Sequence, residues 1–188
     1  MSRPFHAALV AIGLLAGCAD QPVLKPVELL DERTGMSVAA LQEPLELVQA
    51  EIPVIGRRSS FAYLGPVEWN RMGDIRNGLW LHLAPGDDTP FADIRAASAV
   101  TLILDDGALE LSPIDAPSLG REPYRPAVPW GQTAYFDLSV GNLKHLAASH
   151  HLALRCRAAD GSSVLLKGTR DPQPILGAYL QSRGLTGD

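Results

Sequence analysis

The chain has 188 residues, of which 46% are hydrophobic and 20% charged, and its formal net charge is −5. This composition excludes an intrinsically disordered protein, because a chain this apolar can bury enough surface to offset the loss of conformational entropy. Lys and Arg are outnumbered by Asp and Glu and form no run. We therefore expect no nucleic-acid partner, since sequence-independent binding needs clustered basic residues.

The first 17 residues have the composition of a secretory signal peptide. Arg3 and the amino terminus supply positive charge, the stretch from Phe5 to Gly17 is almost entirely apolar, and small residues precede Cys18. The stretch is shorter than the roughly 20 apolar residues that cross a bilayer core. The sequence therefore predicts a signal peptide over residues 1–17 that is removed from the mature protein.

The end of this segment, Leu15-Ala16-Gly17-Cys18, resembles the lipobox of bacterial lipoproteins. The resemblance implies cleavage before Cys18, a diacylglycerol on the Cys18 sulfur and usually acylation of the new amino terminus. Ala19, rather than an acidic residue, follows the cysteine. For Gram-negative members of the family this implies an anchor in the outer membrane, with the protein facing the periplasm.

Residues 18–26 are polar and contain two prolines, and we expect them to form a short lipidated tether. Fully extended, such a segment spans up to roughly 25 Å. Residues 27–188 have the length of one ordinary globular domain. That domain would therefore stay close to its membrane.

Alternation of apolar residues with a period of two predicts half-buried β-strands in four places. In the third of them, Trp69 and Arg71 fall on one face and Glu68 and Asn70 on the other. The four segments are 26–35 (PVELLDERTG), 44–51 (PLELVQAE), 60–73 (SFAYLGPVEWNRMG) and 78–85 (GLWLHLAP).

Two later stretches predict β-hairpins, because an Asp-Gly pair lies between apolar runs. They are residues 99–113, with Asp106-Gly107, and residues 151–168, with Asp160-Gly161. A helical repeat of apolar residues predicts helices at about 139–149, with Ser139 as a cap, and at about 173–183, before Gly184. A third short turn is expected from Pro90.

Many short strands with few helices indicate a mainly β fold. We expect either an antiparallel β-sandwich or a β-rich α+β domain with two short helices. The strands do not alternate regularly with helices, which argues against a doubly wound parallel sheet.

Two segments hold the candidate binding residues. Residues 67–73 (VEWNRMG) place Trp69, Asn70 and Arg71 together at a strand end, where Trp69 could serve as a platform and Arg71 could bind a carboxylate or phosphate. The alternative is a buried core tryptophan followed by a turn. The proline-rich loop 112–131 carries residue types that often anchor protein interfaces, namely Arg121, Tyr124, Arg125 and Trp130.

The sequence contains no familiar catalytic, phosphate-binding or zinc motif, so we assign no catalytic residue, no metal site and no cofactor. His145 and His150 lie five apart, a spacing that does not suit a helical metal pair, and His151 adjoins the second. Paired aspartates such as Asp105-Asp106 are expected to serve turns. Cys156 alternates with apolar residues and is expected to be a buried free thiol.

These features predict a lipid-anchored, non-enzymatic interaction or accessory module of an envelope assembly, with a protein partner. The alternative is a binding domain for a small or polymeric envelope ligand, such as a glycan or lipid, with a pocket near Trp69 and Trp80. An enzyme without recognisable motifs is a third hypothesis, which would require carboxylates or histidines with shifted pKa values in a cleft.

Overall fold

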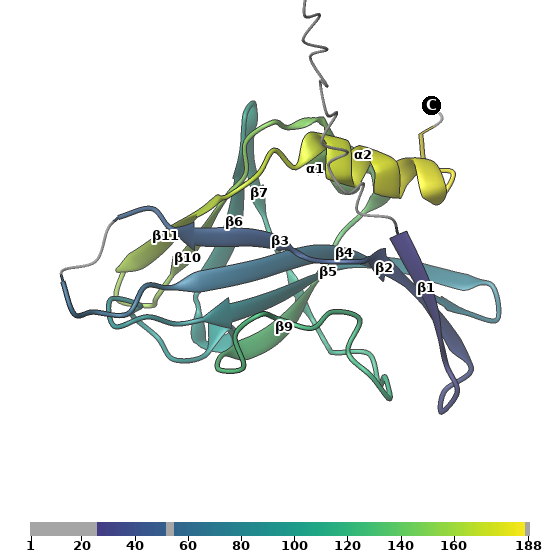
Figure 1. Cartoon of the computed structure of the whole chain (residues 1–188), viewed down its shortest axis with the longest axis horizontal. Helices are drawn as coiled ribbons and strands as arrows, with labels where there is room; N and C mark the ends of the chain where they lie inside the picture. Colours follow the sequence, from purple (N-terminus) through teal and green to yellow (C-terminus); the bar gives the residue numbers. More distant parts are fainter. Residues whose placement is uncertain (1–25, 52–54, 187–188) are drawn as a thin grey trace, which may run out of the picture.

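The computed structural model describes residues 26–51 and 55–186, and Figure 1 shows how they are arranged. The predicted signal peptide, the lipobox with Cys18 and all of the predicted tether except Pro26 lie outside the described residues. Among the helices of the described part, none combines the length and the apolar character that crossing a bilayer requires.

Antiparallel strands make up most of the described domain, together with two α-helices and one short 3₁₀ helix, which confirms the predicted β-rich fold. The helices are α1 (Val140–Ala148), α2 (Gln173–Ser182) and the 3₁₀ helix η1 (Ile94–Ala96). The strands are β1 (Pro26–Asp31), β2 (Met36–Leu41), β3 (Leu45–Gln49), β4 (Phe61–Arg71), β5 (Asp74–Ala84), β6 (Ala99–Leu104), β7 (Gly107–Glu110), β8 (Pro113–Ile114), β9 (Gln132–Asp137), β10 (Ala153–Arg157) and β11 (Ser163–Gly168).

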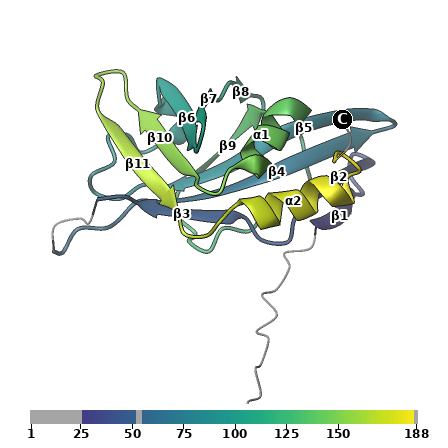
Figure 2. The same ribbon diagram turned by 90° about the horizontal axis from the view of Figure 1, so that it is seen from above.

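The described strands form one continuous sheet, in the order β7-β6-β10-β11-β3-β4-β5-β9-β8. β7 and β8 are at opposite ends of this order, yet only Leu111 and Ser112 separate them in the chain. Two residues bridge only a short distance, so the sheet has to curl until its ends meet. Figures 1 and 2 show the curl, which matches the α+β alternative better than two stacked sheets.

The sheet branches at β4. On the side away from β5, residues 61–64 of β4 pair with β3, whereas residues 67–70 pair with β2, which in turn pairs with β1. Continuing the β2–β4 register by one step would place Leu41 opposite Pro66. The Tyr124 hydroxyl lies there instead, because it accepts from Leu41 N at 3.0 Å and donates to Pro66 O at 2.6 Å.

Tyr124 is therefore a core residue, 4% exposed, and not the surface anchor that the loop composition predicted. Its ring lies over Gly65, where a Cβ atom would be only 2.3 Å from the ring. Only glycine leaves room for the ring at this point of β4. The proline-rich loop thus fills the branch point of the sheet.

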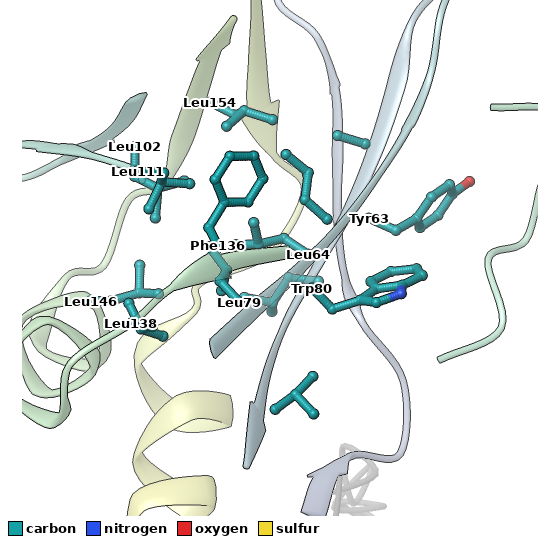
Figure 3. Packing of buried hydrophobic residues seen from close by; sticks show 14 of the residues in the cluster. Tyr63, Leu64, Leu79, Trp80, Leu102, Leu111, Phe136, Leu138, Leu146 and Leu154 are labelled. Atoms are coloured by element: carbon teal, nitrogen blue, oxygen red, sulfur yellow. The ribbon is translucent and has the colours of Figure 1, made fainter. Parts of the chain in front are cut away.

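Alternate residues of β4 and β5 point to opposite faces, as predicted, but both faces are covered. Figure 3 shows Tyr63 and Trp80 on one side of the strands and Leu64, Leu79 and Phe136 on the other. The proline-rich loop covers the first face, and the second packs against helix and strand residues such as Leu102, Leu146 and Leu154. The expectation of half-buried strands is therefore wrong here, since β4 is buried along most of its length.

Both predicted helices are present and begin and end within a residue or so of the predicted bounds. The Ser139 side chain accepts from Asn142 N at 3.1 Å and caps α1, and Gly184, with φ of +67°, follows α2. The predicted short turn is η1, which starts after an Asp93 cap rather than at Pro90. In Figure 1 both helices lie on the same side of the sheet.

A partly buried ion pair links the end of α2 to the branched part of the sheet. Arg183 bonds to the carboxylate of Glu68 on β4, which is 5% exposed, and lies 3.8 Å from Glu28 on β1. Figure 2 shows α2 beside β1 and β2. Glu68 thus faces the helix, whereas its neighbour Trp69 faces the opposite side of the sheet.

Candidate functional site

A groove lies at the outer end of the β4–β5 hairpin. Its volume is about 710 Å³. The start of β2, the residues around β8 and the end of β9 surround the hairpin there. The lining residues are Met36, Trp69, Arg71, Asp74, Arg76, Asn77, Ile114, Asp115, Pro117, Asp137, Leu138 and Ser139.

A tight turn builds this end of the hairpin. Arg71 pairs with Asp74 across a two-residue loop, in which Met72 has φ of +54° and Gly73 has φ of +93°. Positive φ at both positions matches the twist of paired strands. Asn70 stabilises the turn, because its Oδ1 accepts from Gly73 N at 2.9 Å. Asn70 is thus a turn residue. This agrees with the alternative prediction for residues 67–73, a core tryptophan followed by a turn.

Trp69 closes the inner end of the groove, which we call the Trp69 groove. The side chain lies over Gly78, where a Cβ atom would meet the indole at 2.4 Å, and its ring is 5.8 Å from that of Tyr135. Only 6% of the residue is exposed, and its Nε1–H has no hydrogen-bond partner in the described structure. A buried indole N–H normally finds a partner. The groove therefore contains an unused donor.

Asn77 adds the complementary group. Its Oδ1 is also buried without a partner in the described structure, and Asn77 lines the same groove. An unpartnered buried acceptor costs on the order of 1–3 kcal/mol. Asn77 pairs with Glu68 and Trp69 with Arg76, so the unpartnered donor and the unpartnered acceptor lie on opposite faces of the hairpin that the groove borders.

Charges of both signs surround these two atoms. Arg76 lies 3.3 Å from Asp74, and both side chains are largely exposed. Arg71 has no ion-pair partner among residues 26–51 and 55–186. Asp115 and Asp137 line the opposite part of the groove. The groove can therefore donate and accept hydrogen bonds, and it favours neither a strongly anionic nor a strongly cationic ligand.

The proline-rich loop places its candidate residues elsewhere. Arg121 and Arg125 are exposed beside β1 and line a shallower depression of about 460 Å³, which shares no lining residue with the Trp69 groove. Trp130 is 46% exposed, and its carbonyl lies 3.3 Å from His82 Nε2. Burial lowers the pKa of His82. Of the seven candidates, Trp69 and Arg71 line the Trp69 groove, whereas Arg121, Tyr124 and Arg125 line the second depression.

Trp80, the other half of the predicted ligand pocket, belongs to the core. It is fully buried, its Nε1 donates to Glu122 at 3.0 Å, and the same carboxylate oxygen accepts from the Tyr135 hydroxyl at 2.6 Å. The Trp80 ring lies 5.0 Å from that of Tyr124. It therefore offers no open aromatic platform.

The three histidines singled out in the sequence pair with carboxylates near the ends of α1 and α2. His145 bonds to Asp106 at 2.6 Å, and His151 bonds to Asp105 at 2.7 Å. The hydrogen bond to the Asp171 carboxylate, at 2.9 Å, raises the pKa of His150. Each histidine has its own carboxylate partner at the surface.

Cys156 has the environment that its sequence pattern predicts. The side chain is fully buried on β10, and burial raises the pKa of its thiol to about 12. A thiolate, not a thiol, is the reactive form. The folded protein therefore holds this cysteine in an unreactive state.

No family model, no curated protein and no solved structure matches this chain.

Proposed function

We propose that the chain is a lipoprotein anchored in the cell envelope through Cys18, and that its domain is a non-enzymatic interaction module. In this proposal the domain faces the periplasm from the outer membrane and binds a protein partner in the Trp69 groove. The leader and its lipobox support the anchor, and the groove supports the binding role.

The observation that carries the binding role is the unpartnered Trp69 Nε1–H. The indole is 94% buried, so little water reaches it, and the groove is the open space that it lines. Leaving such a donor unpaired destabilises the free protein by about 1–3 kcal/mol. A partner that accepts this hydrogen bond recovers that free energy on binding.

A small or polymeric ligand is the second candidate for the groove. A glycan normally stacks on the exposed face of an aromatic ring, but Trp69 is almost entirely buried and Trp80 fully so. The protein partner is favoured for this reason. A glycan or lipid remains an outcome that the experiment below can identify.

Photo-crosslinking from the groove tests the proposed function. The full-length, lipidated protein carries a photoreactive amino acid in place of Arg71, and the control carries it in place of Arg157, an exposed arginine on β10. We expect a discrete protein adduct from position 71 that is absent from position 157 and absent when Trp69 is replaced by phenylalanine. A lipid or glycan adduct would select the second candidate, and equal labelling from both positions would refute a role for the groove.

The anchor has its own test. Cys18→Ser removes the acylated sulfur, so we expect the acyl mass to be lost. The variant for the location test also replaces residues 1–17 by a secretory signal peptide whose cleavage does not need the cysteine, and we expect it to move from the membrane fraction to the soluble fraction. Each buried methylene contributes about 0.8 kcal/mol to membrane binding, so two or three acyl chains determine the location. Retention of the variant in the membrane fraction would contradict the anchor.

A further inference from the structure

The Trp69 groove runs along a free edge of the sheet. β9 ends at Asp137, which pairs with Gly78, so residues 74–77 of β5 continue beyond their neighbour. Within the described part of the chain, these four residues pair only with β4. Figure 1 shows the β4–β5 hairpin projecting past β9. A strand therefore ends beside the groove and leaves the position next to β5 unfilled.

The register fixes which backbone groups face that position. Arg71 and Asp74 flank a two-residue turn, and such a flanking pair exchanges backbone hydrogen bonds, as does every second pair after it. Asp74 and Arg76 therefore direct their N–H and C=O groups toward β4. Ile75 directs its N–H and C=O groups away from β4, toward the free edge. Asn77 directs its groups toward β9, where the Gly78–Asp137 pair already uses its C=O and leaves its N–H at the edge.

We infer that the groove binds an extended peptide segment of a partner, which adds to the edge of β5 as a further strand beside residues 75–77. This inference rests on the proposed function and names the chemistry of the partner. A peptide backbone carries donors and acceptors in alternation, which matches the N–H and C=O of Ile75 and the N–H of Asn77 at the edge. Two buried side-chain groups near this edge also lack partners, the Trp69 Nε1–H on one face of the hairpin and Asn77 Oδ1 on the other.

The surroundings of the edge fit such a segment. Met72, Ile75 and Ile114 are exposed large apolar residues near the groove, with 101%, 55% and 37% of their surface accessible. Side chains of an added strand alternate between the two faces of the sheet. Those on one face would contact the groove with Arg71 and Ile114, and those on the other would pass Ile75.

Backbone pairing makes a sharp prediction at Ile75. Its N–H points outward, so Ile75→Pro removes the edge donor and places a ring there while the β4 ladder stays intact, because proline is tolerated on the open side of an edge strand. Ile75→Ala is the matched control, since it shortens the side chain and keeps the N–H. The two variants separate backbone pairing from side-chain contact.

The probe is a phage-displayed library of random linear peptides, selected on the full-length lipidated protein in detergent micelles. We expect an enriched peptide whose synthetic form binds, with Kd raised about tenfold or more by Ile75→Pro and changed less than about threefold by Ile75→Ala. Circular dichroism of both variants checks that the hairpin folds. If the Ile75→Pro variant does not fold, the test uses the wild-type protein and peptides that are N-methylated at one residue at a time. We then expect the affinity to fall only when the methyl group is on every second residue of the peptide.

The outcomes separate this inference from the proposed function. One outcome is a peptide whose affinity falls with Trp69→Phe but does not change with Ile75→Pro or with N-methylation of alternate peptide residues. Such a peptide would bind the groove without adding a strand, which overturns the inference. The inference also fails if no peptide is enriched while position 71 still crosslinks to a partner. If position 71 captures no protein either, the proposed function falls with it.

Discussion

The hydroxyl of Tyr124 is expected to contribute more to stability than any other single oxygen in the aromatic cluster on its face of the sheet. Tyr124→Phe keeps the ring over Gly65 and removes only the oxygen that bridges Leu41 N and Pro66 O. Both backbone groups then lie buried without a partner. Each such group costs about 1–3 kcal/mol, so we expect the free energy of unfolding to fall by about 2–5 kcal/mol.

For a domain of this size, 1 kcal/mol corresponds to roughly 2–4 °C in melting temperature. We therefore expect Tyr124→Phe to melt about 5–15 °C below the wild type, and chemical denaturation to give the same order. Tyr135→Phe is the matched control, because it removes a hydroxyl whose acceptor, Glu122, is an exposed residue that water can reach. We expect this control to lose about 1 kcal/mol or less.

Equal losses in the two variants would refute the reasoning, because they would show that a water or a shift of β2 satisfies Leu41 N and Pro66 O. A second variant probes the same junction from the backbone. Gly65→Ala introduces a Cβ that would lie 2.3 Å from the Tyr124 ring. Displacing that ring should cost about 1–3 kcal/mol even though the hydroxyl is present.

Three further outcomes follow from the described contacts. Arg183→Met leaves the buried Glu68 carboxylate without its partner, so we expect the free energy of unfolding, measured by chemical denaturation, to fall by about 3–5 kcal/mol. Adding Glu68→Gln to this variant removes the unpaired charge and should restore part of the lost stability. Asp171 raises the pKa of His150, so their contact stabilises the fold fully below the ordinary histidine pKa of 6.5. This stabilisation is lost as the pH rises through the higher pKa of the folded state. Asp171→Asn should reduce that loss in thermal melts and lower the pKa of His150 in an NMR titration, toward the ordinary value. The raised pKa of Cys156 predicts that iodoacetamide at pH 8 labels the unfolded but not the folded protein, and rapid labelling of the native state, followed by mass spectrometry, would contradict its burial.

Elements with local sequence signals were predicted well. Ser139 and Gly184 delimit helices, Asp160-Gly161 lies in the loop of a hairpin, and Cys156 follows the alternation of a buried strand. At the other hairpin the turn is Asp105-Asp106, one residue earlier than predicted, because Leu104 pairs with Gly107. Capping, turn chemistry and period-two alternation act over a few residues, so they can be read without knowledge of the fold.

Elements that depend on distant partners were missed. β2 (MSVAAL) does not alternate, because both of its faces are covered, and β9 lies beyond the proline-rich loop without a strong pattern. β5 begins at Asp74, four residues before the predicted strand, because pairing with β4 holds its polar start in place. No local pattern predicts that Asn77 and Trp69 line one groove. The end of β9 forms another part of that groove, and it lies 60 residues after Asn77 in the chain.

The two-residue connection between β7 and β8 also constrains how the chain reaches its native state. The sheet closes on itself only when β3, near the start of the domain, pairs with β11, near its end, in a ladder that joins residues 47–49 to 166–168. Such a non-local contact forms late, because the entropy of closing a long loop opposes it. Until residue 168 is available, β3 and β10 each lack a neighbour and can pair with other chains. Synthesis therefore has to deliver nearly the whole polypeptide before this domain can protect its own edges.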